Sequence, residues 1–161
     1  MTKTTRIAYI SVFTALIAGV TLMGIPVGIG YVHLGDAVIM LACHMLGYYG
    51  AIAGALGASI ADLAFGYAIY APVTLVAKTL LAVIGVWICK RIKGVWGLAI
   101  GFTVSGIFMQ GAYFLFDFCY LGAYASTLNI FWLIMQTVLS VPVGIALIAV
   151  IDRVNKRKPL G

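Results

Sequence analysis

Glutamate is absent from this 161-residue sequence, and charged residues of all kinds make up only 9% of it. In a soluble domain, roughly a quarter of all residues are charged, so this chain cannot build a water-exposed surface. Hydrophobic residues amount to 64%, which indicates an integral membrane protein. The net charge of +6 comes mainly from lysines and arginines at the ends of apolar segments. There they orient the chain and contact anionic lipid headgroups, so we predict the lipid bilayer as a partner and no nucleic acid.

The motifs of common enzyme chemistries are missing as well. We find no metal-spaced set of His, Asp and Glu, no Gly-x-Ser-x-Gly and no phosphate-binding loop, and we predict no catalytic site, metal site or cofactor. A filter-like channel segment and an internal inverted repeat are not visible either. Because no ATP-binding sequence is present, ATP-driven transport would need an ATPase on another chain. Cys43, Cys89 and Cys119 lack disulfide or metal spacing and are interpreted as small buried side chains.

Apolar segments divide the chain into a single membrane domain, residues 1–161. The first apolar run is long enough to cross a bilayer of roughly 30 Å. It lacks a convincing cleavage site, so we interpret it as a retained helix and not as a signal peptide. "GYYGAIAG" separates the second and third segments, Pro72 suits the first turn of the fourth, and Asn129 is a possible cap of the sixth. The six predicted spans are residues 6–25, 36–49, 50–68, 72–89, 95–118 and 128–151.

The positions of the basic residues predict the orientation. With six spans, all three basic clusters fall on one side of the membrane, which the positive-inside rule makes the cytoplasmic side. An odd number of spans would separate them. We therefore predict an all-α bundle of six transmembrane helices with both termini in the cytoplasm. The clusters comprise Lys3, Arg6, Lys90, Arg91, Lys93, Arg153, Lys156, Arg157 and Lys158.

Small residues recur at four-residue spacing in the first and third spans. Such stripes let helix backbones approach closely. In the third span, Gly50 and Gly54 belong to a stripe that we expect to pack inside the bundle. In the first span the stripe is Ser11, Ala15 and Gly19. Internal packing and docking to a partner membrane subunit are both open for it.

Polar side chains gather in the outer half of the predicted bundle and share helix faces. Lipid cannot satisfy such groups, so they face the bundle interior or a water-filled cavity. The sequence therefore predicts an outward-facing pocket for a small polar ligand, with aromatic side chains to stack on it. The candidate binding residues are His33, Asp36, Asp62, Tyr67, Lys78, Tyr113, Asp117, Asn129, Trp132 and Gln136.

Structural roles remain open for several of these residues. Asp36 is placed to cap the second span, where a carboxylate suits the helix dipole. Asp62 is an alternative partner for Lys78 in a structural ion pair. The other structural alternatives are solvated positions for His33 and Asp117, a satisfied core position for His44, and interhelical hydrogen bonds for Gln110 and Gln136.

Residues 31–82, "YVHLGDAVIMLACHMLGYYGAIAGALGASIADLAFGYAIYAPVTLVAKTLLA", resemble the substrate-binding (S) components of energy-coupling factor (ECF) transporters. The resemblance rests on "HLGDA", "GALGASIADL" and "YAPVTLVAK", and "NIFWLIMQ" is similar to the final-helix signature. More narrowly, the chain resembles the branch for hydroxymethylpyrimidine or pyridoxine-type substrates. These proteins are small vitamin-uptake subunits in the membranes of bacteria and some archaea.

The resemblance implies a six-helix fold and a vitamin pocket near the outer surface, closed by the first outer loop. It also implies three partner chains, namely a transmembrane coupling subunit and two ATP-binding subunits. Small residues on the family's first helix contact the coupling subunit, and Ser11, Ala15 and Gly19 match that stripe with one alanine retained. Toppling of the S component in the membrane is the transport mechanism that the family implies.

The favoured hypothesis is therefore a substrate-capture subunit for hydroxymethylpyrimidine or a pyridoxine-like compound, with riboflavin or another vitamin as the alternative. Two hypotheses from other classes stay open. One is a membrane-embedded enzyme that uses Asp62 and Asp117. The other is a solitary proton-coupled carrier that uses Asp62 or Asp36.

Overall fold

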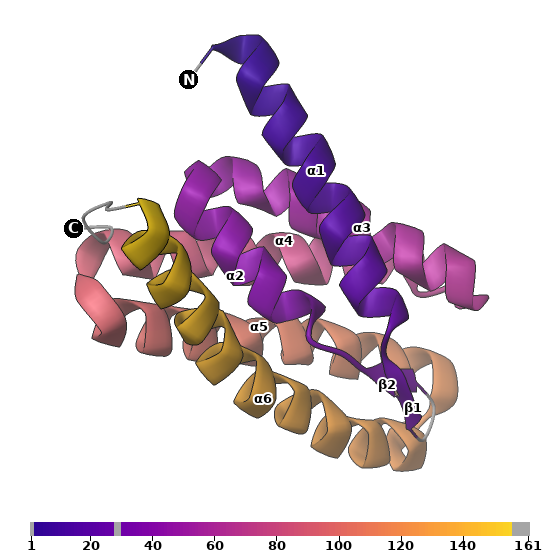
Figure 1. Ribbon diagram of the computed structural model, residues 1–161. Coiled ribbons are helices and arrows are strands. Elements are labelled where there is room, and N and C mark those ends of the chain that lie inside the picture. Colours follow the sequence, from indigo (N-terminus) through magenta and orange to yellow (C-terminus); the bar gives the residue numbers. More distant parts are fainter. Residues whose placement is uncertain (1, 28–29, 156–161) are drawn as a thin grey trace.

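A computed structural model of the chain describes residues 2–27 and 30–155. Lys156, Arg157 and Lys158, which entered the orientation argument, lie outside these residues. Within them the helices pack side by side, and a small β-hairpin lies at one end of the bundle (Figure 1). The elements are α1 Lys3–Leu22, β1 Ile25–Val27, β2 Gly30–Val32, α2 Gly35–Leu46, the 3₁₀ turn η1 Gly47–Tyr49, α3 Gly50–Phe65, α4 Ala71–Arg91, α5 Gly94–Leu121 and α6 Ala123–Asn155.

Five stretches of the described chain are long and apolar enough to cross a membrane: α1, α4, α5, α6 and the stretch Gly35–Phe65. The last of these contains α2, η1 and α3, which together form a helical hairpin. Gly47 has a φ of +61°, and a Cβ on Gly50 would lie 2.6 Å from the backbone nitrogen of Cys43. Four residues further on, a Cβ on Gly54 would lie 3.1 Å from Cγ2 of Ile39. The break predicted at "GYYGAIAG" is thus confirmed, and α3 runs back along α2.

The first predicted span ends earlier than expected. α1 ends at Leu22, and Ile25 already belongs to β1, which pairs with β2 in antiparallel register. Pro26 lacks the N–H that a helix interior needs. A Cβ on Gly24 would lie 2.7 Å from the ring of Tyr31, so only glycine allows this close return of the chain. The hairpin was not predicted from the sequence.

Two helix starts differ in how well they were predicted. Pro72 lies in the first turn of α4, as expected. α6 begins at Ala123, five residues before the predicted start. Asn129 is therefore inside the helix, and its interpretation as a cap was wrong. The chain turns sharply between α5 and α6 at Gly122, which has a φ of +88°.

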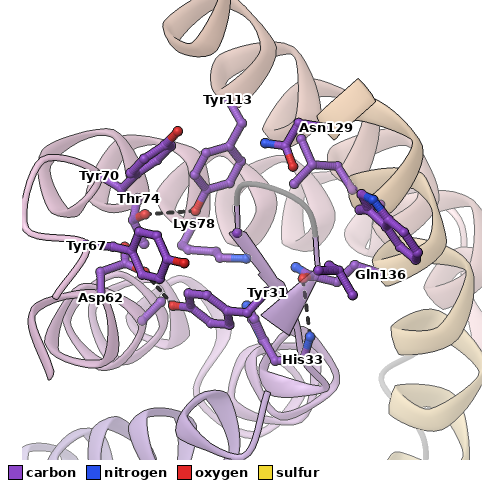
Figure 2. A pocket seen from close by; sticks show the side chains of 15 residues that line it. Tyr31, His33, Asp62, Tyr67, Tyr70, Thr74, Lys78, Tyr113, Asn129 and Gln136 are labelled. Carbon is purple, nitrogen blue, oxygen red and sulfur yellow. Dashed lines mark hydrogen bonds between the residues drawn. The ribbon is translucent and has the colours of Figure 1, made fainter. Parts of the chain in front are cut away.

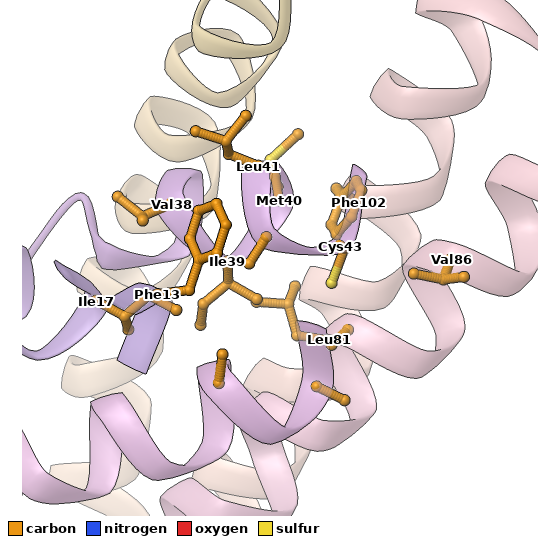
Figure 3. Close-up of a cluster of buried hydrophobic side chains, with 14 of the residues drawn as sticks. Phe13, Ile17, Val38, Ile39, Met40, Leu41, Cys43, Leu81, Val86 and Phe102 are labelled. Carbon is orange, nitrogen blue, oxygen red and sulfur yellow. The ribbon is translucent and has the colours of Figure 1, made fainter. Parts of the chain in front are cut away.

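Small residues set the spacing of the inner helices. A Cβ on Gly57 would lie 2.7 Å from the carbonyl oxygen of Thr14, so the small face of α3 is pressed against α1. The core between these helices is filled by aliphatic and aromatic side chains of α1, α2, α4 and α5, among them Phe13, Ile39 and Phe102 (Figure 3). Of the three cysteines, Cys43 is buried and Cys89 half-buried, but Cys119 is exposed. The expectation of a buried side chain was wrong for Cys119.

The two ends of the bundle differ in chemistry. At one end, Arg6 of α1 donates a hydrogen bond to the hydroxyl of Tyr49, 2.9 Å away, and His44 of α2 lies 2.9 Å from Asp152 of α6. The start of α1 and the last turns of α6 therefore meet at the turn between α2 and α3. The hairpin and the first turns of α2, α4 and α6 lie at the opposite end (Figure 1).

Candidate functional site

A cavity lies at the hairpin end of the bundle, among the hairpin, α3, α4, α5 and α6. It encloses about 620 Å³, including its open mouth. Eight of the ten predicted binding residues line it, and Figure 2 shows their side chains gathered around one space. These eight are His33, Asp62, Tyr67, Lys78, Tyr113, Asn129, Trp132 and Gln136. Asp36 and Asp117 do not line the cavity but bond to residues that do.

Lys78 and Asp36 form a buried ion pair at the cavity wall. The Lys78 ammonium lies 2.6 Å from one carboxylate oxygen of Asp36, and the side-chain amide of Gln136 donates to the other at 2.7 Å. Lys78 is only 1% exposed and Asp36 only 3%. The alternative pairing of Lys78 with Asp62 was therefore wrong. Asp36 also makes no capping hydrogen bond, because the residue at the cap position of α2 is Leu34.

Asp62 is bound by the hairpin. The hydroxyl of Tyr31 in β2 donates a hydrogen bond of 2.5 Å to Oδ1 of Asp62 in α3. The Tyr31 ring also packs on Phe65 and Tyr67, with centroids 4.5 Å and 5.7 Å away. Burial, followed by the bond to Asp62, raises the pKa of Tyr31 well above its usual value, so Tyr31 stays a donor. The other oxygen of Asp62 is buried and has no hydrogen-bond partner among the described residues.

Asp117 joins three elements at the cavity rim. It accepts hydrogen bonds from the Tyr70 hydroxyl at 2.8 Å and from the Asn129 amide at 2.6 Å. Its side chain is fully buried, so the solvated position considered for it was wrong. Since both carboxylate oxygens are already bonded, Asp117 positions Tyr70 and Asn129 around the cavity.

His33 lies between β2 and α2 and is buried, so the solvated alternative was wrong for it too. Its Nδ1 accepts a hydrogen bond from the backbone of Gly35 at 3.0 Å, and its own backbone N–H donates to Gln136 at 3.4 Å. Burial, together with the charge of Lys78, lowers the pKa of His33 to about 4. The imidazole is therefore neutral at physiological pH.

The glutamines do connect helices, as considered. Gln110 of α5 donates to the carbonyl of Leu133 and to the hydroxyl of Thr137, both in α6. Gln136 links α6 to Asp36 in α2 while also lining the cavity. A structural hydrogen bond and a cavity position are thus compatible in one residue.

Three polar cavity residues are not among the ten predicted binding residues: Tyr31, Tyr70 and Thr74. Thr74 shares a hydrogen bond of 2.9 Å with the Tyr113 hydroxyl. It lies one helical turn before Lys78, and that spacing placed it on the same face. Tyr31 lies two residues before His33, which puts both on one face of a strand. This two-residue spacing indicates a shared face only if residues 30–32 are recognised as a β-strand, and the sequence predicted a loop there.

The family model described as "ECF-type riboflavin transporter, S component" matches residues 1–153. The chain belongs to this family. Its fold is similar to the solved structure of the S component of a bacterial ECF transporter, with a TM-score of 0.83 and 17% identity. That match covers 97% of this chain and 100% of the solved one. The predicted family and a location in a prokaryotic membrane are confirmed.

A curated relative from Pyrococcus woesei, described as an uncharacterized protein in gap 3′ region, is 36% identical over 90 residues. The match covers 55% of this chain and 60% of the relative, so the chain spans about three fifths of that protein's length. S components are transporter subunits and not enzymes, and the hypothesis of a membrane-embedded enzyme is therefore abandoned. The hydroxymethylpyrimidine or pyridoxine branch stays a prediction.

Proposed function

We propose that this chain is the substrate-capture subunit of an ECF importer and binds a small heterocyclic vitamin or precursor, hydroxymethylpyrimidine or a pyridoxine-like compound. One observation carries the proposal: aromatic rings and hydrogen-bonding groups share one cavity at the hairpin end. Such a combination of apolar walls with a few convergent polar groups is typical of small-molecule sites. Tyr67, Tyr113 and Trp132 offer ring faces, and Asn129 offers an amide for ring nitrogens and hydroxyl groups.

The charges around the cavity favour a ligand that is not an anion. The charge of Lys78 is neutralised by Asp36 at 2.6 Å. His33 is neutral at physiological pH, because burial lowers its pKa to about 4. A carboxylate or phosphate ligand would therefore find no free cation among the described lining residues, and it would meet Asp62.

Riboflavin in the same role is the second candidate, favoured by the description of the matching family. Its larger ring system also needs aromatic walls and amide partners, and it carries no net charge. The two candidates differ in size and in the groups that they present to Asp62, so binding measurements separate them.

The proposal includes six membrane crossings with both termini in the cytoplasm. The hairpin of α2 and α3 supports the even number of crossings, since α3 returns along α2. Lys3, Arg6, Lys90 and Arg153 belong to elements that meet at the end opposite the cavity. By the positive-inside rule, that end faces the cytoplasm and the cavity faces outward.

The proposed partners are a transmembrane coupling subunit and two ATP-binding subunits. On α1, Ser11, Ala15 and Gly19 are all exposed, and a Cβ on Gly19 would meet nothing within 4 Å. This supports docking of the stripe to another helix in preference to internal packing. Toppling of the subunit would then carry the closed cavity across the membrane.

The direct test is mass spectrometry of ligand released from the purified protein, followed by titration with hydroxymethylpyrimidine, pyridoxine and riboflavin. Trp132 lines the cavity, so its fluorescence should change on binding and Trp132→Phe should remove that change. A protein that binds no heterocycle would refute the proposal. Uptake that continues without the ATP-binding subunits, but stops when the proton gradient is collapsed, would favour the solitary carrier instead.

A further inference from the structure

The carboxylates near the cavity are not equally satisfied. Both oxygens of Asp36 are bonded, one by Lys78 and one by Gln136. Both oxygens of Asp117 are bonded by Tyr70 and Asn129. Asp62 differs, because Tyr31 occupies its Oδ1 while its Oδ2 is buried without a hydrogen-bond partner among the described residues. Buried polar atoms are normally hydrogen-bonded, so this exception calls for a physical reason.

Two groups near Asp62 already have hydrogen-bond partners of their own. The Lys78 ammonium is held by Asp36 at 2.6 Å. The Thr74 hydroxyl lies beside Asp62 and shares a hydrogen bond of 2.9 Å with the Tyr113 hydroxyl, in which either group can be the donor. Asp62 itself is 5% exposed and lines the cavity. A ligand in the cavity that Asp62 lines can therefore supply a donor to Oδ2, which has no hydrogen-bond partner among the described residues.

We propose that Asp62 is the specificity-determining acceptor of the site and that the substrate is an aminated heterocycle with its amino group next to a basic ring nitrogen. This inference rests on the proposed function and narrows its substrate class. The amino N–H donates to Oδ2. When the ring nitrogen is protonated, its N–H lies parallel to the amino N–H and can use the second lone pair of Oδ1, which Tyr31 leaves free.

The same geometry disfavours oxo-heterocycles. A ring carbonyl in place of the amino group would direct an acceptor oxygen at the acceptor Oδ2, and neither atom could donate. Riboflavin presents an imide, in which two carbonyls flank one N–H, so it matches Asp62 less well than an aminopyrimidine does. Pyridoxine has a basic ring nitrogen but no adjacent amino group, and it offers at most one N–H.

The test compares hydroxymethylpyrimidine with its oxo analogue, in which a ring carbonyl replaces the amino group. By titration calorimetry of the purified wild-type protein, the amino compound should bind about 10- to 150-fold more tightly, the range expected for a hydrogen bond to a charged group. Asp62→Asn keeps an acceptor for Tyr31 and adds an amide donor. It should lower affinity for the amino compound and raise affinity for the oxo analogue, so that the preference disappears or inverts.

Asp152→Asn is the matched control, because it makes the same change at the opposite end of the bundle, where Asp152 contacts His44. It should leave the preference at the wild-type value. The wild-type comparison tests the proposal even if Asp62→Asn fails to fold. Equal wild-type affinity for both compounds, an unchanged preference in Asp62→Asn, or binding of riboflavin alone would overturn this inference and leave the capture function intact. Binding of no heterocycle would overturn both.

Discussion

Replacing Lys78 by methionine tests the buried ion pair most directly. Methionine has a similar length and no charge, and Lys78 already lies 3.4 Å from the sulfur of Met109. The substitution leaves Asp36, which is only 3% exposed, with the amide of Gln136 as its remaining side-chain donor. An uncompensated buried carboxylate is the physical source of the expected loss.

The magnitude follows from the burial of both partners. Removing one member of a buried ion pair costs about 3 to 5 kcal/mol of the free energy of unfolding. For a domain of this size that corresponds to a fall in the melting temperature of about 6 to 20 °C. An exposed pair would cost only about 0 to 1 kcal/mol. The two cases are therefore easy to tell apart.

The assay is thermal unfolding of ligand-free protein in detergent for the wild type, Lys78→Met, Asp36→Asn and the double variant. The double variant removes both charges, and its asparagine keeps an oxygen for Gln136. It should be more stable than the sum of the two single losses predicts, by about 0.5 to 3 kcal/mol. Additive losses, or a single variant as stable as the wild type, would show that the two side chains are not coupled as described.

Three further predictions concern the hairpin and the helix packing. The pKa of His33 is about 4 in the folded state and about 6.5 in the unfolded chain. The contribution of neutral His33 to the free energy of unfolding should therefore be fully present above pH 6.5 and decrease by about 3 kcal/mol towards pH 4. Melting curves of His33→Asn should lack this decrease. Gly57→Val should cost about 1 to 3 kcal/mol by overpacking against α1, whereas Gly19→Val should melt like the wild type but recover less coupling subunit in co-purification. Tyr31→Phe should speed ligand release in stopped-flow measurements, because the hairpin loses its bond to Asp62; an unchanged release rate would contradict that role.

The fold class and the position of the site follow from simple properties of the sequence. The scarcity of charge identifies a membrane protein, and the glycines around Tyr48 and Tyr49 mark the turn between α2 and α3. Eight of the ten predicted residues line one cavity, and six of these eight lie on the helices α3 to α6, where helical periodicity applies. Periodicity succeeds here because lipid cannot satisfy polar groups, so every polar face must turn inward.

Pairing within the site could not be predicted in the same way. Asp36 and Asp62 both lie in the same half of the bundle, on faces that turn inward. Which of them meets Lys78 depends on how far each helix is rotated about its axis. That rotation is set by contacts such as Gly54 on Ile39 and Gly85 on Phe102, where a few tenths of an ångström matter. No spacing rule in one sequence contains this information.

Charge counting nevertheless limits the possibilities. Among the described residues, the half of the bundle that holds the cavity has one lysine and three aspartates, and Asp117 is satisfied by neutral donors, a tyrosine and an asparagine. Lys78 can neutralise only one of the other two carboxylates. The carboxylate that is not paired with Lys78 needs hydrogen-bond donors from other residues. The hairpin supplies one hydroxyl to Asp62, from Tyr31, and a carboxylate has two oxygens. The acceptor left without a hydrogen-bond partner among the described residues is Asp62 Oδ2, and Asp62 lines the cavity.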